Sequence, residues 1–145
     1  PIKVEYPLFW DKENLSLSQL IKLSSDAHAD IMQQVKVRFF QYIDDDEYEI
    51  VKIDGVQNQH LYDQYWRERE CAIQSVGEEK LNERHLFFGA SSNEKYRCVM
   101  RDGFSMQKIA KEKQVAYELG DGMYFAQDAN FWLACLAANS HGVYK

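Results

Sequence analysis

ERHLFFGAS at residues 83–91 and GDGMYFA at residues 120–126 are the two segments that decide how this chain folds. Each combines a short apolar run with glycine, a pattern typical of a buried strand beside a turn or a close backbone approach. We therefore predict a short buried strand in each segment. By themselves, Gly120 and Gly122 predict only a tight turn, because the third glycine and the strand–loop–helix frame of a dinucleotide-binding fold are absent.

The rest of the chain is interpreted as helices and strands joined by polar turns. Ile31, Val35 and Phe39 recur every four residues, which predicts a helix that begins after Asp26 and ends near Tyr42. Further helices are predicted at residues 61–74, from Ser91 or Ser92 to about residue 101, and from Asp128 or Asn130 onward. The predicted strands span residues 48–56, 85–88 and 123–126, and residues 1–24 are predicted to form an extended lead-in.

Length and composition indicate one globular domain over residues 1–145. Hydrophobic residues make up 46% of the chain and aromatic residues 14%, which is enough to build a core. The net charge of -6 and the pI near 5.2 disfavour nucleic acid as a partner, because its recognition needs a basic surface. No run of about 20 apolar residues is present, so no membrane span is expected, and residues 1–5 do not resemble a secretory signal.

The cysteines and histidines predict neither a disulfide framework nor a metal site. Cys71, Cys98 and Cys135 are far apart and odd in number, which indicates reduced thiols in an intracellular protein, nuclear or cytoplasmic. The four histidines share no metal-ligand spacing with one another or with the cysteines. The acidic run at residues 44–47 is interpreted as a solvated turn, since the ligand spread over about 12 residues and the central glycine of a calcium loop are absent.

Several segments together carry a family resemblance. LGDGMYFA at residues 119–126 resembles a pattern of the poly(ADP-ribose) polymerase-like family of ADP-ribosyltransferases, in which Gly-x-Gly-x-Tyr-Phe-Ala follows an apolar or aromatic residue. Further similar segments occur in the family's order: PLFW at 7–10, IVKIDGVQN at 50–58, a helix from residue 61, NERHLF at 82–87 and DGF at 102–104. The resemblance is closest to the mono-ADP-ribosyltransferase branch.

The resemblance implies an α+β fold, with a mixed, mainly antiparallel sheet and helices packed on it. The family's domain continues with several strands beyond the point that corresponds to Lys145, so the C-terminal strands are expected to be missing from this chain. A sheet that stops there has an unpaired edge. We therefore expect a protein partner, which could complete this C-terminal edge by adding a strand.

The resemblance also implies a nicotinamide pocket whose side chains are partly replaced. Gly89, whose backbone binds the carboxamide in the family, and Tyr124, which stacks on the nicotinamide ring, are retained. Phe88 stands where the family has the ribose-binding histidine, Ala90 where it has Thr or Ser, and Trp132 where a helix serine binds the carboxamide. The turn at Gly120 and Gly122 lies beside this pocket. The third position of the family's triad lies on a later strand, outside this chain.

These replacements predict weak or absent NAD binding. Each hydrogen bond lost to a polar ligand costs roughly 1–3 kcal/mol, so two or three losses lower the affinity by about 10²–10⁴. Phe88 is interpreted either as ordinary strand packing or as a plug that closes the pocket, and Tyr124 either as a stacking residue or as a core aromatic. No cofactor is expected, and NAD would be bound only if the second of the following alternatives holds.

Three functions follow from the resemblance. The first is a catalytically inactive ADP-ribosyltransferase-fold domain that serves as a protein-interaction or regulatory module. The second is an active mono-ADP-ribosyltransferase that uses NAD in an atypical pocket. The third is an RNA- or nucleotide-binding module on the same fold. The loss of the histidine at Phe88 favours the first over the second, and the acidic balance disfavours the third.

Overall fold

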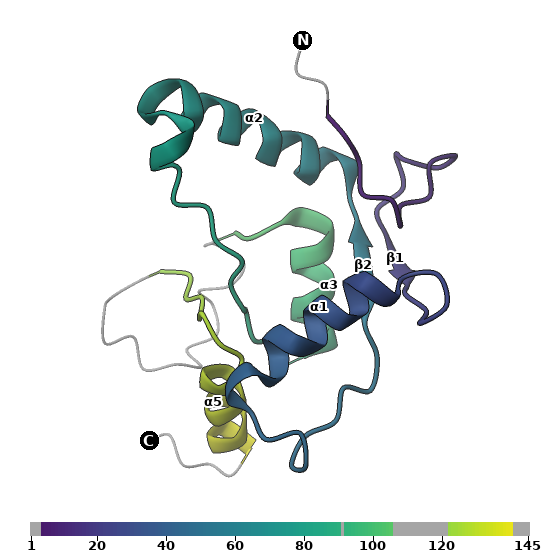
Figure 1. The fold of residues 1–145 in the computed structure, drawn as a ribbon, viewed down its shortest axis with the longest axis vertical. Coiled ribbons are helices and arrows are strands. Elements are labelled where there is room, and N and C mark those ends of the chain that lie inside the picture. The colour runs from purple at the N-terminus through teal and green to yellow at the C-terminus, as the bar shows by residue number, and fades with distance from the viewer. Residues whose placement is uncertain (1–3, 91, 106–121, 141–145) are drawn as a thin grey trace. The chain divides into compact units, whose positions relative to one another are not determined.

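The computed structural model describes residues 4–90, 92–105 and 122–140 (Figure 1). These residues form a mixed α and β structure with one two-stranded antiparallel sheet and four α-helices. The coarse α+β class is therefore confirmed. The elements are, in order, β1 (Gln19–Lys22), α1 (Ala29–Phe39), the 3-10 turn η1 (Phe40–Tyr42), β2 (Asp54–Gln57), α2 (Gln59–Val76), the 3-10 turn η2 (Glu78–Lys80), α3 (Asn93–Asp102) and α5 (Asn130–Ser140).

The chain divides into two compact units, which are described separately below. The first unit comprises Pro1–Ala29 and Lys52–Arg84, and contains the sheet and α2. The second unit comprises Asp30–Val51 and His85–Lys145, and contains α1 from Asp30 onward, α3 and α5. A single domain over residues 1–145 stays a prediction.

The sheet of the first unit differs from the expected strands. β1 pairs with β2 from Gln19 opposite Gln57 to Lys22 opposite Asp54. The predicted strand at residues 48–56 is therefore wrong over its first six residues, because the ladder ends where its four-residue partner ends. Within the extended lead-in predicted for residues 1–24, residues 19–22 form a strand, β1, that the sequence pattern did not predict.

Gln57 and Asn58 join the sheet to α2 rather than merely ending the strand. The Gln57 side chain is fully buried: its Oε1 accepts from the Asp11 N–H at 2.7 Å, and its Nε2 donates to the Asn14 carbonyl at 2.9 Å. Asn58 is the N-cap of α2 and accepts from the Leu61 N–H at 3.1 Å. Two buried amide side chains are thus satisfied, as buried polar groups must be.

Aromatic side chains of the first unit pack together around the start of α2. Trp10, which is buried, stacks on Tyr6 with ring centroids 5.4 Å apart and meets Tyr62 at 5.1 Å. Trp66, one turn further along α2, contacts Tyr62 at 6.2 Å. These offset and tilted arrangements are the favourable ones for aromatic pairs.

The helices of the second unit agree with their predicted positions. α1 begins at Ala29, so Asp26 lies in the preceding turn and does not cap it. Ser92 is the N-cap of α3 and accepts from the Lys95 N–H at 3.3 Å. α3 ends at Gly103, whose φ of 76° places it in the region where glycine is favoured. Asp128 Oδ1 accepts from the Phe131 N–H at 3.2 Å at the start of α5.

The predicted strands at residues 85–88 and 123–126 are reduced to one antiparallel bridge. Phe87 and Ala126 exchange two backbone hydrogen bonds, and neither segment continues as a ladder among the described residues. Strands this short depend on further neighbours for their regularity. Residues 106–121, which include Gly120, lie outside the described residues.

Candidate functional site

The bridge between Phe87 and Ala126 brings the two decisive sequence segments together within the second unit. The Phe87 N–H donates to the Ala126 carbonyl at 2.7 Å, and the Ala126 N–H donates to the Phe87 carbonyl at 2.9 Å. Gly89 follows two residues after this bridge, and α5 begins four residues after it. Phe87 and Ala126 are far apart in sequence, so the bridge between them brings the residues that flank Phe87 close to those that flank Ala126.

Trp132 of α5 lies directly on the backbone of Gly89. A Cβ atom placed on Gly89 would be 2.6 Å from Cε3 of the indole and 2.7 Å from Cδ2, well inside carbon–carbon contact distance. The indole Nε1 donates to the Phe87 carbonyl at 2.9 Å. With only 9% of Trp132 exposed, the ring is held by both packing and a hydrogen bond. Gly89 is therefore used for a close approach, by the chain's own tryptophan.

Phe88 packs against three other aromatic rings. Its ring centroid lies 5.1 Å from that of Phe104, 5.8 Å from Phe125 and 5.7 Å from Trp132. Phe104 and Phe125 also meet each other at 4.9 Å, edge to face. We call Phe88, Phe104, Phe125 and Trp132 the aromatic cluster. Such a cluster is stabilised by its ring-to-ring contacts, and it offers no hydrogen bond at the Phe88 position.

Ala90 lines an open depression together with Phe88. The depression has a volume of about 610 Å³ and is lined by Phe88, Ala90, Ser92, Asn93 and Tyr96. The Ser92 hydroxyl in this lining already accepts the hydrogen bond from the Lys95 N–H that caps α3. The depression is open to solvent, and Asn93 and Tyr96 also contribute polar side chains to its lining.

The remaining predicted site residues are Tyr124, Gly120 and Gly122, and none of them belongs to the aromatic cluster. Tyr124 is half-buried, two residues before the bridge at Ala126. Gly122 has room for a side chain, since the nearest atom to a Cβ placed there is Cε2 of Tyr124 at 3.9 Å. Gly120 lies outside the described residues. The structure thus brings Phe88, Gly89 and Trp132 into contact, and places Ala90 in the lining of the depression.

Sequence reasoning missed a supporting residue on α1. Arg38 Nη2 donates to the His85 carbonyl at 2.7 Å, and its guanidinium carbon lies 6.0 Å from the centre of the Phe87 ring. This contact ties α1 to the segment that carries Phe88 and Gly89. No local pattern signals it, because Arg38 and His85 are 47 residues apart in sequence.

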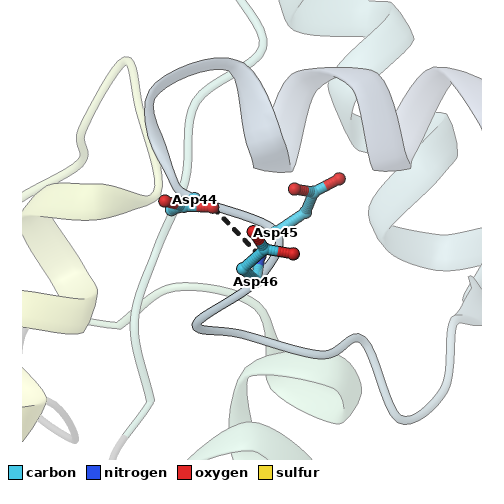
Figure 2. A group of neighbouring side chains, drawn as sticks. All are labelled: Asp44, Asp45 and Asp46. Carbon is cyan, nitrogen blue, oxygen red and sulfur yellow. Dashed lines mark hydrogen bonds between the residues drawn. The ribbon is translucent and has the colours of Figure 1, made fainter.

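The acidic turn is the only group of described residues with the composition of a cation site. Asp44, Asp45 and Asp46 have carboxylate oxygens within 4.8 Å of one another, and all three are exposed (Figure 2). Figure 2 shows the bond from the Asp46 N–H to Asp44 Oδ1, at 3.0 Å, which belongs to an ordinary turn. Nothing further at this turn indicates an ion, so the interpretation as a solvated turn is retained.

Comparison with known protein families returns no match: no family model fits this sequence. No helix within the described residues combines the length and the apolar character required to cross a bilayer.

Proposed function

We propose that this chain is a catalytically inactive domain of the ADP-ribosyltransferase fold, with a mixed, mainly antiparallel sheet, that serves as a protein-interaction or regulatory module. The observation that supports this proposal is the position of Trp132 on Gly89. In the family that the sequence resembles, the glycine backbone at this position binds the nicotinamide carboxamide. Here an indole lies against the Cα of that glycine, where a Cβ would otherwise project.

Steric exclusion is the first argument against NAD binding. Carbon atoms in contact lie about 3.5–4.0 Å apart, whereas even a Cβ on Gly89 would be 2.6 Å from the indole. A planar ligand can reach this face only if Trp132 leaves it. Leaving would break the bond from Nε1 to the Phe87 carbonyl and expose a side chain that is 9% exposed, a cost of several kcal/mol for a residue of this size.

Lost chemistry is the second argument. Phe88 stands where a histidine would bond the ribose, and its ring is packed against three other aromatic rings. Transfer of ADP-ribose depends on holding NAD in a reactive geometry, and a site without these groups loses that positioning. We therefore infer that the aromatic cluster acts as a plug.

A protein partner is supported by the outer rings of this region. Phe104 is 45% exposed and Phe131 is 44% exposed. Large aromatic side chains that remain half-exposed beside a packed cluster are typical of surfaces that contact other proteins.

The depression beside Ala90 favours a second candidate, a mono-ADP-ribosyltransferase with an atypical pocket. Its volume of about 610 Å³ is within the range of small-molecule sites. In this alternative NAD would enter from the side of Ser92 and Asn93 and would not contact the face of Gly89 under Trp132.

A thermal-shift titration with NAD and with nicotinamide, followed by a labelled-NAD transfer assay, separates the two candidates. A ligand at about 100 times its Kd would raise the melting temperature by roughly 5–10 °C. We expect no saturable rise and no transfer. A saturable rise in the parent protein would overturn the plug and place the second candidate first.

A variant designed to gain nicotinamide binding tests the same proposal. Phe88→His, Ala90→Ser and Trp132→Ser together restore the family's side chains and uncover Gly89. We expect this triple variant, if folded by circular dichroism, to bind nicotinamide more tightly than the parent. Phe125→His is the matched control, because it adds an imidazole to the aromatic cluster without uncovering Gly89.

A further inference from the structure

Tyr48 begins an irregular segment that belongs to no helix or strand. It follows the acidic turn at residues 44–47, and residues 48–53 have no regular secondary structure. Residues 48–51 make no backbone hydrogen bond to any other described residue. Val51, three residues on, is 89% exposed. A segment without backbone partners can be drawn into the cleft of another protein without breaking secondary structure.

The phenol of Tyr48 is available for reaction. Its side chain is 39% exposed and makes no hydrogen bond or ring contact with the described residues. By contrast, the Tyr6 hydroxyl donates to Asp63 at 3.0 Å and that of Tyr62 donates to the Glu5 carbonyl at 3.1 Å. The hydroxyl of Tyr48 therefore has no interaction within the described structure that a reaction would have to break.

Tyr48 stands among five carboxylates. Asp44, Asp45, Asp46, Glu47 and Glu49 all lie within four residues of it and are exposed. None of them has an ion-pair partner among the described residues. The segment is thus a concentrated negative charge around one phenol, and such a charge attracts a cleft lined with basic residues.

We propose that Tyr48 is a phosphorylation site for a tyrosine kinase with a basic substrate cleft. The phenolic oxygen attacks the γ-phosphorus of ATP, the bond from that phosphorus to the β-phosphate oxygen breaks, and ADP leaves. The phenolic proton passes to the catalytic base of the kinase. The proposal rests on the free phenol and on a backbone that makes no hydrogen bond to the other described residues, and the acidic residues provide recognition.

Phosphorylation would also open the acidic turn. The phosphate adds a charge of about -1.5 to -2 beside the five carboxylates. In the unmodified chain, Asp44 closes the turn by accepting from the Asp46 N–H at 3.0 Å through its side chain, and from the Glu47 N–H at 3.2 Å through its carbonyl. Closing the turn holds the charges together, so added repulsion disfavours it.

The test is phosphorylation of the whole chain by a purified tyrosine kinase domain that prefers acidic substrates, with Mg²⁺ and ATP, mapped by mass spectrometry. Tyr42 is the matched control: it is 65% exposed, but it lies in η1, accepts a bond from Gln41 Nε2, and has no acidic residue in the three positions before it. We expect phosphate on Tyr48, loss of that phosphate in Tyr48→Phe, and no loss in Tyr42→Phe.

Charge variants and a peptide make the result decisive. Asp45→Asn with Asp46→Asn should lower the initial rate about tenfold through lost electrostatic attraction. A synthetic peptide of residues 42–54 should be modified at a rate similar to that of the whole chain. Equal modification of Tyr42 and Tyr48, modification of the peptide but not the whole chain, or no modification of either would overturn the proposal.

Discussion

Adding one methyl group to Gly89 tests the position of Trp132 directly. Among the described glycines only Gly77 and Gly103 have positive φ, so the backbone of Gly89 accepts alanine without strain. The new Cβ would lie 2.6–2.9 Å from three indole carbons. Such overpacking costs about 1–3 kcal/mol, whereas alanine stiffens the unfolded chain and returns about 0.4–1 kcal/mol. Gly89→Ala should therefore destabilise the protein by about 1 kcal/mol net.

The double-mutant cycle with Trp132→Ala isolates the contact. Trp132→Ala alone should cost about 3–5 kcal/mol through the cavity that it leaves. In that background the clash is absent, so Gly89→Ala should stabilise by about 0.4–1 kcal/mol. The interaction energy of the cycle should then be about 1–3 kcal/mol, measured by urea denaturation of the four proteins.

One outcome refutes the reasoning: Gly89→Ala stabilises both backgrounds equally. That result would mean that the indole does not lie on Gly89 in solution, and the plug would lose its support. Should Trp132→Ala fail to fold, the single variant still decides by NMR. The Trp132 indole N–H, which donates to the Phe87 carbonyl at 2.9 Å, should shift in Gly89→Ala.

The other predictions concern groups outside the aromatic cluster. Gln57→Ala should lower the free energy of unfolding in urea by about 2–4 kcal/mol, because the groups bonded to this buried amide lose their partner. The control variant Gln64→Ala, at an exposed position of α2, should change that free energy by under about 0.5 kcal/mol. The side chain of Asn14 donates to Asp11 and holds the pKa of that carboxyl below its ordinary value of 3.8. Because the pKa of Asp11 is lower in the folded state, the carboxylate stabilises the fold above the unfolded-state pKa, and this stabilisation is lost as the pH falls through the folded-state pKa. An NMR titration of Asp11 should therefore give a midpoint below 3.8, and that midpoint should rise in Asn14→Ala. An unchanged midpoint in Asn14→Ala would contradict the contact. Ser92→Ala should cost about 1 kcal/mol in thermal unfolding as α3 loses its cap, and an unchanged melting temperature would show that the cap is dispensable.

Local signals predicted the helices well because a helix is held by contacts within a few residues. Ser92 caps α3 and Gly103 ends it, as their residue types predict. The spacing of Ile31, Val35 and Phe39 likewise predicted α1 close to its observed bounds. The strands were predicted poorly, because β2 is only as long as β1, a partner more than 30 residues away that carries no clear pattern of its own.

By itself the sequence determined the mixed α and β class, the helix positions and the presence of Phe88 and Trp132 beside two short apolar segments. Only the tertiary structure decided where these two side chains lie. Trp132 is 43 residues from Gly89 along the chain, and its place on that glycine depends on the bridge at Phe87 and on the start of α5. Many arrangements of apolar side chains that are distant in sequence would bury a similar area, and residue type alone does not select one of them.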